Sequence, residues 1–600
     1  MKKAIIKTLI WVGVLMMATT TVHAQNKADT VKQKHTESVV IYGSSKPVTG
    51  QALKIGRKPK VPALQMSTVP LAARLSNPTV PTNFAFKEVK PGRPVAFSAK
   101  EQVWNNLLTF GLGSRISPLL EYFYSGGKPK KYLLTVNLRH HSSFLNIKDY
   151  LPSPYTASLA GGSYDKFFRY HVLSVHGQYE IRTNRYYGWK HEGDTNTYDT
   201  DDPRLKQYYQ TASFGIKFAS NYRTQYKLNH LFRADGYYLW DRHGMSETNY
   251  RFDFDLHKGF RVTQIFNHQQ LGIQGGFDYY KNETTAIPQN DVVNSDYYGR
   301  FLPYFDARYG IFSFKAGLNL EWLKQQQGKL HFYPYVHVNV NVAPGIFSFF
   351  AGVKGGLQKN SLRTLSRINP FLSSELIDFR WENTKFEAYG GFRGNILRHF
   401  GFEMRAGYRS FSDMALFDHV QYTFIGPYPN VYNAQGKLIP FKDDFAVYYA
   451  NGHVFDLSGS LTYGNTPHLD MWLTGTYHSY SLKNSLKPLY KPLVEFKLGT
   501  AYVAGKITPW VEVYYMGHRW AHRLPYYNPY SSAVYPTANN LPFEYTLDDY
   551  FDLNLGVKYR IDRQLSAFIR VTNLLNKQYD LFDEYPVNGL EIMVGVRYRF

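Results

Sequence analysis

The closing residues Leu590–Phe600 read LEIMVGVRYRF, and their alternation decides the fold. Apolar side chains occupy every second position, at Leu590, Ile592, Val594, Val596, Tyr598 and Phe600. The positions between them hold Glu591, Met593, Gly595, Arg597 and Arg599. Side chains of an extended strand point to opposite faces in turn. One aliphatic face and one face with arginines are typical of a transmembrane strand that has lipid on one side and water on the other.

The same alternation recurs upstream, at residues 565–572, 551–560 and 336–342. From Trp104 onward, strand-like segments follow one another, separated by glycine, asparagine, proline or charged turns. We expect about 22 strands of the length that a tilted membrane strand requires. An open sheet edge would leave backbone groups unpaired in hydrocarbon, so the sheet must close. The predicted fold is all-β: one closed antiparallel transmembrane barrel over residues 104–600.

A soluble β-sandwich also alternates, but its strands are shorter and it has no reason to end on an aromatic residue. Here short and long connections alternate along the chain, as periplasmic turns and outer loops do. The predicted outer loops are residues 186–204, 282–296, 360–382, 426–443 and 519–549.

Composition supports a barrel and excludes other classes of protein. Aromatic residues reach 17% and charged residues 19%, while the mean hydropathy of −0.39 argues against a bundle of membrane helices. The chain has no cysteine, which excludes disulfides, thiolate metal sites, cysteine nucleophiles and a lipidated cysteine. The net charge is +23, yet no zinc spacing or basic-aromatic RNA motif indicates nucleic acid. We assign the charge to a lumen that favours anionic solutes or to contact with anionic lipid.

The first residues have the features of an export signal. Lys2, Lys3 and Lys7 precede the uncharged apolar run Leu9–Met17, and Val22-His23-Ala24 places small residues where a signal peptidase reads them. We predict a signal peptide at residues 1–24 and a mature chain that begins at Gln25.

Residues 25–103 form a different, basic and proline-rich segment. Lys54, Arg57, Lys58 and Lys60 cluster beside Pro59 and Pro62. Proline removes backbone donors, and so polar a segment cannot bury enough apolar surface to fold alone. We expect an unstructured extension, interrupted by one short apolar stretch at residues 37–43.

The C-terminal strands resemble those of TonB-dependent receptors. The string RVTNLLNKQYD at residues 570–580 is similar to the penultimate-strand signature of that family, and LNLGVKYR at residues 553–560 supports it. The motif positions are Asn573, Leu574, Asn576 and Tyr579. The closing residues Val594, Val596, Tyr598 and Phe600 resemble the signal that the outer-membrane assembly machinery reads. Residues 119–124, a turn at Gly126–Gly127 and residues 134–141 look like the family's first hairpins.

The stretch at residues 37–43 looks like a TonB box, the extended segment that adds a strand to the sheet edge of TonB. It consists of Glu37, Ser38, Val39, Val40, Ile41, Tyr42 and Gly43. In the family a globular plug follows the box and fills the lumen. Here the segment before the first barrel strand is too short and too polar for one. The resemblance therefore implies a barrel that lacks the plug domain.

Catalytic and metal-binding patterns are not found in the sequence. His140-His141-Ser142-Ser143 brings histidine and serine together, but neighbours on a strand face opposite sides. Asp194, Asp199, Asp201 and Asp202 do not follow the spacing of an EF-hand loop and are interpreted as a solvated outer loop. We expect no catalytic residues, no metal and no cofactor.

These features predict a protein of the cell outer membrane that transports or takes up an unidentified solute. The alternative is a platform barrel for a periplasmic or surface protein, and a barrel enzyme is the third class considered. The expected partners are outer-membrane lipid, the barrel assembly machinery, and TonB or another periplasmic protein, with no nucleic acid.

Overall fold

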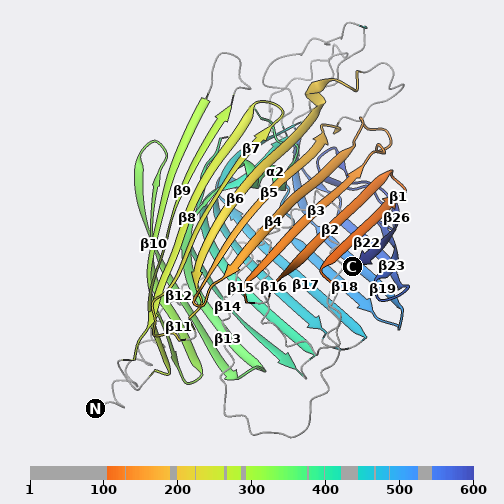
Figure 1. Ribbon diagram of the computed structural model, residues 1–600. Coiled ribbons are helices and arrows are strands. Elements are labelled where there is room, and N and C mark those ends of the chain that lie inside the picture. Colours follow the sequence, from red (N-terminus) through yellow and green to blue (C-terminus); the bar gives the residue numbers. More distant parts are fainter. Residues whose placement is uncertain are drawn as a thin grey trace. The chain divides into compact units, whose positions relative to one another are not determined.

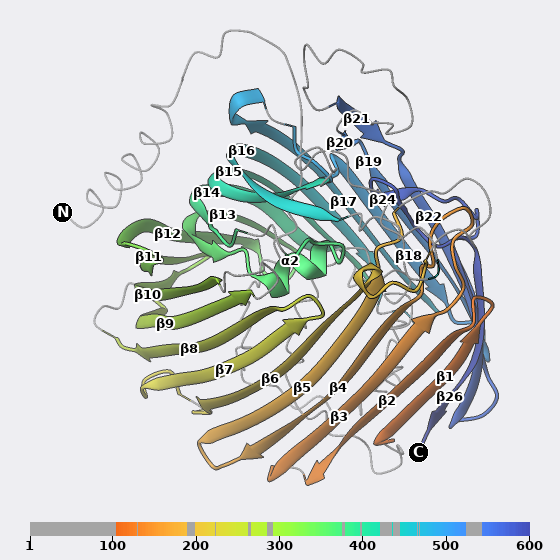
Figure 2. The same ribbon diagram turned by 90° about the horizontal axis from the view of Figure 1, so that it is seen from above.

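The computed structural model describes residues 104–600 except 129, 189–198, 223, 262–265, 285–291, 375–377, 397–398, 420–434, 436–443, 465, 467, 486 and 524–542. Its strands stand side by side in a ring (Figures 1 and 2). The signal peptide, the segment at residues 37–43 and the question of a plug lie outside the described residues.

The ring is one 22-stranded antiparallel sheet, in which each strand pairs with the next and the last pairs with the first. Its first half comprises β1 (Asn106–Gly113), β2 (Ser117–Lys128), β3 (Tyr132–Ser143), β4 (Tyr155–Phe167), β5 (His171–Arg185), β6 (Lys206–Ser220), β7 (Asn229–Asp241), β8 (Met245–Gly259), β9 (His268–Thr284), β10 (Val292–Tyr309) and β11 (Phe312–Lys324). The second half comprises β12 (Gly328–Ala343), β13 (Phe347–Lys359), β14 (Trp381–Ile396), β15 (Phe400–His419), β16 (Phe445–Tyr463), β17 (Leu469–Leu482), β18 (Val494–Tyr502), β19 (Ile507–Gly517), β22 (Tyr550–Arg560), β23 (Leu565–Thr572) and β26 (Glu591–Arg599). The predicted closed barrel is confirmed.

Smaller elements occupy the connections. They are α2 (Leu362–Ile368), the 3-10 helices η3 (Pro203–Leu205) and η5 (Lys483–Ser485), and the short hairpins β20 (Arg519–Arg523) with β21 (Phe543–Leu547) and β24 (Asp580–Phe582) with β25 (Tyr585–Pro586). Among the described residues no helix has the length and apolar character that a membrane crossing needs.

The barrel closes where β26 pairs with β1. The backbone N–H of Asn106 donates to the carbonyl of Phe600 at 3.0 Å, and the N–H of Phe600 donates to the carbonyl of Asn106 at 3.2 Å. The side-chain amide of Asn106 adds a bond to the same Phe600 carbonyl, at 3.0 Å. The chain's final residue therefore fastens the seam.

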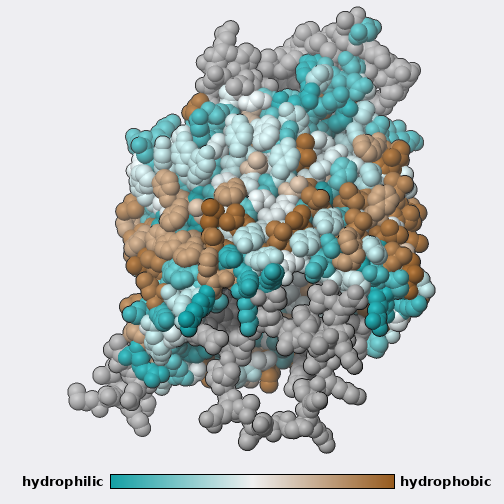
Figure 3. Space-filling model, viewed as in Figure 1, coloured by the Kyte–Doolittle hydropathy of each residue, from teal (hydrophilic) through white to brown (hydrophobic). Residues whose placement is uncertain are grey.

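On the face shown in Figure 3, apolar residues gather in a band across the middle of the barrel, with hydrophilic residues above and below it. On β26, Val594, Val596 and Tyr598 are 52%, 44% and 39% exposed, whereas Met593 on the inner face is 1% exposed. Outward aromatic rings gather near both ends of the strands. Tyr279 and Tyr297 lie 5.1 Å apart near one end, and Phe347 and Phe402 lie 6.1 Å apart near the other. An apolar band with aromatic girdles is the lipid-facing surface of an outer-membrane barrel.

The two ends of the barrel carry connections of different length. One end has short turns such as residues 310–311 and 344–346, and the other has connections such as residues 186–205, 360–380 and 573–590. Short turns are periplasmic in barrels of this kind and long loops face outward. Asn106 and Phe600 lie at the short-turn end, which is the periplasmic side.

Three sequence predictions need correction. Residues 282–284 and 292–296 belong to β9 and β10 rather than to a loop, because the two strands stay paired as far as Thr284 and Val292. Gly126–Gly127 lies inside β2, and the turn follows Lys128. The predicted loop at residues 519–549 contains the β20–β21 hairpin.

Candidate functional site

A cluster of buried side chains, here called the mouth core, lies inside the long-loop end of the barrel. It joins inward residues of the wall to residues of the connections 360–380 and 573–590. Its members are Tyr186, Tyr209, Leu239, Met245, Leu362, Leu365, Phe371, Leu372, Phe379, Ala415, Phe417, Phe445, Val447, Met516, Tyr550, Tyr579, Leu581, Phe582, Tyr585 and Val587. The view along the barrel shows α2 within the ring of strands (Figure 2). The long connections therefore fold into the lumen.

The two connections meet through aromatic rings. Phe371 stacks on Tyr585 with ring centroids 3.8 Å apart and an interplanar angle of 23°. Phe445, at the start of β16, lies 5.8 Å from Tyr585 and 5.4 Å from Phe582. Tyr585 and Phe445 are 1% and 0% exposed. Packed aromatic pairs stabilise by about 0.5–1.5 kcal/mol beyond the surface that they bury, so this contact helps to hold the two connections together.

A carboxylate on the wall holds α2 in place. Glu247 of β8 is 0% exposed and accepts hydrogen bonds from the backbone N–H groups of Leu362 at 2.7 Å and Arg363 at 3.2 Å. These N–H groups belong to the first turn of the helix, where no helical carbonyl can accept from them and where negative charge is favoured. Ser361 caps the helix by accepting from the N–H of Thr364.

The far side of α2 is fixed to β5. The guanidinium of Arg182 donates to the Ser366 carbonyl and to its hydroxyl, both at 3.1 Å. Arg367 forms an ion pair with Glu180. The helix therefore bridges two separate stretches of the inner wall.

The asparagines of the predicted family motif shape the connection 573–590. Asn573 and Asn576 have φ values of 47° and 49°, in the left-handed region that asparagine tolerates better than most residues. The Asn573 amide donates to the carbonyls of Lys577 and Asn588, both at 2.9 Å, and the Asn576 side chain accepts from the N–H of Leu590 at 2.8 Å. The motif thus folds the connection back on itself.

The other motif residues attach this connection to the wall. The N–H of Leu574 donates to the carbonyl of Leu553 at 2.9 Å. The Tyr579 hydroxyl donates to the carbonyl of Phe551, and its ring lies 4.2 Å from that of Tyr550.

Buried polar side chains also bond to the connection 573–590. Arg519 is 1% exposed and donates to the carbonyls of Leu581 at 2.9 Å and Asp548 at 3.0 Å. His419 at the end of β15 lies 3.3 Å from the Asp583 carboxylate, and both side chains are 1% exposed. Desolvation in the mouth core raises the pKa of Tyr186 and Tyr187 well above the usual range, so both phenols stay neutral.

Below the mouth core the inner wall is polar and holds many ion pairs. Arg251 and Asp253 on β8 lie 2.6 Å apart. Arg409 and Glu382, which join β15 to β14, also lie 2.6 Å apart, with side chains 3% and 8% exposed. A wall of this kind is wetted and suits the passage of hydrophilic solutes.

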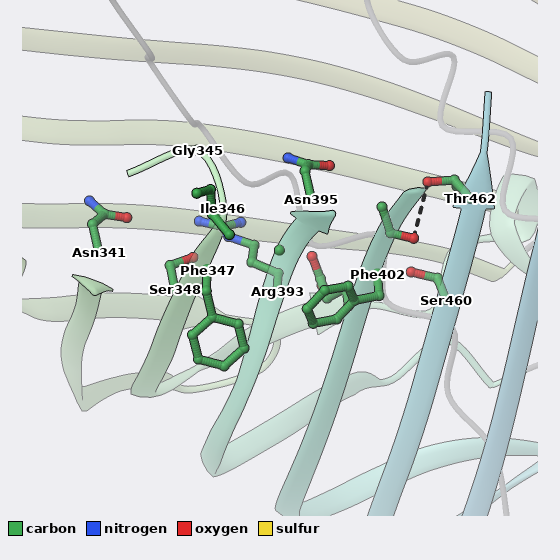
Figure 4. Close-up of a pocket in the computed structure, with 13 residues that line it drawn as sticks. Asn341, Gly345, Ile346, Phe347, Ser348, Arg393, Asn395, Phe402, Ser460 and Thr462 are labelled. Carbon is green, nitrogen blue, oxygen red and sulfur yellow. Dashed lines mark hydrogen bonds between the residues drawn. The ribbon is translucent and has the colours of Figure 1, made fainter. Parts of the chain in front are cut away.

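A cleft of about 400 Å³, here called the rim cleft, opens in the inner wall at the periplasmic end (Figure 4). Its polar lining comes from β12 to β16: Asn341, Ser348, Arg393, Asn395, Glu403, Ser460 and Thr462. The rings of Phe347 and Phe402 point away from Asn341 and Asn395, toward the lipid face. The rim cleft therefore lies directly behind the periplasmic aromatic girdle.

Among the described residues, the histidine and serine side chains considered as catalytic candidates do not form a catalytic group. His140 contacts Ser158 at 2.8 Å and Ser142 at 3.3 Å, while His141 faces the lumen. Asp201 lies 3.7 Å from Arg185 and 3.5 Å from Lys206, as expected of an outer loop. Among the described residues no group of three or more histidine or acidic side chains has the arrangement of a metal site.

Solved structures with the same architecture identify the fold. The ferripyoverdine receptor of the outer membrane of Pseudomonas aeruginosa superposes with a TM-score of 0.57 at 14% identity, over 83% of this chain and 72% of that one. The chain has the barrel fold of TonB-dependent siderophore receptors. The siderophore receptor PirA from Acinetobacter baumannii gives a TM-score of 0.58 at 11% identity, over 83% of this chain and 81% of that one.

The ferric-catecholate import receptor Fiu from E. coli K12 gives a TM-score of 0.56 at 10% identity, over 83% of this chain and 82% of that one. No family model matches the sequence, and no curated protein matches it. This barrel belongs to the outer membrane, as its apolar band and aromatic girdles indicate.

The sequence did not reveal the mouth core. Phe371 comes from the predicted outer loop at residues 360–382, whereas Phe582 and Tyr585 follow the family motif, in a stretch for which no loop was predicted. The available signal was the density of aromatic and aliphatic residues at 579–587.

Proposed function

We propose that this protein is an outer-membrane uptake barrel whose mouth opens to admit a solute. The observation that carries the proposal is the mouth core: described parts of the long connections fold inward and pack against the inner wall at the outer end of the lumen. A closed sheet of about 22 strands encloses an interior wide enough for a channel or a transported ligand. A barrel that served only as a platform would not need a barrier built from its own loops and anchored to the wall at Glu247 and Arg182.

The likeness to siderophore receptors supports uptake, and the polar wall supports a hydrophilic solute. The partners that we propose are outer-membrane lipid, the barrel assembly machinery, and TonB or another periplasmic protein that engages residues 37–43. Transport, rather than catalysis, accounts for the arrangement of the inner wall.

The experiment removes the lumenal part of the connection 360–380. Replacing residues 362–374 by a short glycine-serine linker leaves the strands intact and removes α2 together with Phe371. In planar bilayers the variant should show large, steady conductance where the native protein shows little. Cells that produce it should become sensitive to a large hydrophilic antibiotic.

A matched variant shortens the loop at residues 144–154, which supplies no member of the mouth core, and should leave conductance unchanged. Equal, low conductance in all three proteins would mean that the mouth core is not the barrier. Loss of a co-purifying periplasmic protein without any change in conductance would favour the platform function.

A further inference from the structure

The rim cleft contains a carboxylate without a counterion. Glu403 on β15 is register partner to Arg393 on β14 and Ser460 on β16. The Arg393 guanidinium turns away: it donates to Asn339 at 3.4 Å and lies 5.5 Å from the centre of the Phe350 ring. Within the described part of the chain no cation forms an ion pair with Glu403, whereas Glu387 and Glu382 on the same wall each bind an arginine.

The side chains around Glu403 suit an extended peptide. Amides of asparagine offer a donor and an acceptor together, which is the pattern of a peptide unit. Asn395 and Thr462 are exposed to the lumen, and Gly401 between them leaves the floor open: a Cβ there would lie 3.1 Å from Asn395 Oδ1 and 2.6 Å from Thr462 Oγ1. Hydroxyls of Ser348 and Ser460 extend the polar lining.

A peptide with the required charge is tethered at the same end of the barrel. The described chain enters β1 at Asn106, at the periplasmic end, and the basic cluster Lys54 to Lys60 lies upstream of it. As the unstructured chain that the sequence predicts, the stretch from Lys60 to Asn106 would have a root-mean-square length of roughly 35–40 Å or more, because its prolines favour extended conformations. A closed, tilted sheet of this size is about 45 Å across. Effective concentration is greatest when tether length matches the span.

We propose that the rim cleft binds the chain's own basic extension, with the Glu403 carboxylate receiving a lysine or arginine side chain of residues 54–60. The segment lies against the inner wall on β12 to β16, its backbone bonded to the asparagine, serine and threonine side chains of the cleft. The rim cleft lies on β12 to β16, on the opposite side of the lumen from the seam between β1 and β26.

The absence of cysteine makes the proposal directly testable, because engineered thiols have no competitors. Lys58→Cys combined with Ser460→Cys should form a disulfide when the full-length protein is oxidised in native outer membranes. The matched control is Lys58→Cys with Ser566→Cys, since Ser566 also faces the lumen near a short turn but has Arg560 and Arg597 as its register partners instead of a carboxylate. We expect a yield at least several-fold higher for the Ser460 pair.

The same disulfide assay tests the charge of Glu403 and the open space at Gly401. Adding Glu403→Lys should lower the yield several-fold, and pairing it with Arg57→Glu should recover part of it. Gly401→Leu, which fills the cleft, should lower the yield without altering charge. If Glu403→Lys does not fold, as judged by heat-modifiable mobility, the milder Glu403→Gln replaces it as the variant that removes the negative charge.

Equal yields for the Ser460 and Ser566 pairs would overturn the proposal, as would yields unaffected by Glu403→Lys. Capture of Ser460→Cys by a separate periplasmic protein, in place of the internal disulfide, would assign the rim cleft to that partner instead.

Discussion

The rings of Phe371 and Tyr585 stack face to face at 3.8 Å, joining the connection between β13 and β14 to the connection between β23 and β26. This contact links opposite parts of the sequence across the lumen. Point mutations of either ring can therefore measure how strongly side-chain packing holds the two connections together.

Removing either ring should loosen the mouth. Phe371→Ala should cost about 3–5 kcal/mol of local stability, the usual cost of truncating a buried aromatic ring. The double variant with Tyr585→Ala should be less damaging than the sum, with a coupling energy of about 0.5–1.5 kcal/mol. Midpoints for loss of the heat-modifiable band measure both. Additive effects would show that the rings do not act as a pair. Phe214→Ala, which removes an exposed ring on the lipid face, is the control and should lower the same midpoint less than Phe371→Ala does.

Glu247 should govern the attachment of α2. Glu247→Gln keeps the size but removes the charge at the helix N-terminus, where charge contributes up to about 2 kcal/mol in partly buried geometry. Trypsin should then cut after Arg363 or Arg367 in intact barrels, and it should spare both sites in the native protein. Glu283→Gln, which removes an exposed ion pair with Lys281, should change nothing. Protection of α2 in Glu247→Gln would contradict the anchoring role.

The motif asparagine Asn573 combines a left-handed backbone with two side-chain bonds. Asn573→Gly keeps the backbone conformation and loses the bonds, each contributing about 0.5–1.5 kcal/mol. Asn573→Ala loses the bonds and adds the strain of a positive φ, about 1–2 kcal/mol. Thermal stability should therefore fall in the order Asn, Gly, Ala. A reversed order for the two variants would mean that the backbone of Asn573 is unstrained.

Depth in the bilayer should set the cost of charge on the outer face. Val594→Arg, in the middle of β26, should cost about 2–4 kcal/mol, whereas the same change near an interface costs about 0–1 kcal/mol. Val293 is as exposed as Val594, at 53% against 52%, and lies where β10 extends beyond the band. Val293→Arg should therefore be tolerated. Similar abundance of the two variants in outer membranes would place the band elsewhere.

The final residue should control assembly. Deleting Phe600 removes the carbonyl that accepts from both the backbone and the side chain of Asn106. The deletion should lower the amount of folded barrel in the outer membrane, measured by heat-modifiable mobility. Phe600→Tyr keeps the aromatic ring and the backbone bonds and should assemble normally.

The barrel itself was predictable, because lipid imposes a strict local rule. Val594 and Val596 face hydrocarbon, Arg597 and Arg599 face the lumen, and the alternation is visible in the sequence alone. The limits of the strands were harder to predict. Past the girdle residues Tyr279 and Tyr297, β9 and β10 continue to Thr284 and Val292, where lipid no longer enforces alternation.

The candidate sites were not predictable, since they depend on contacts between distant segments. Nothing near Glu247 in the sequence indicates that it caps a helix whose first residue is Leu362. The rim cleft likewise needs Asn341, Glu403 and Thr462 from separate strands, brought together only by the register of the sheet. The motif at Asn573 was recognisable as a string, but its part in folding the mouth follows from its backbone geometry.

The bond between Asn106 and Phe600 spans 494 positions of the chain. Contacts of such high sequence separation form late and slowly, because the entropy of closing the chain must be overcome first. The seam cannot form until synthesis and export are complete, so a prematurely terminated chain presents two unpaired sheet edges to the membrane. Edges of that kind are templates for aggregation. Pairing of the first and last strands of the barrel therefore removes both edges at once, and a chain that lacks β26 would keep β1 unpaired.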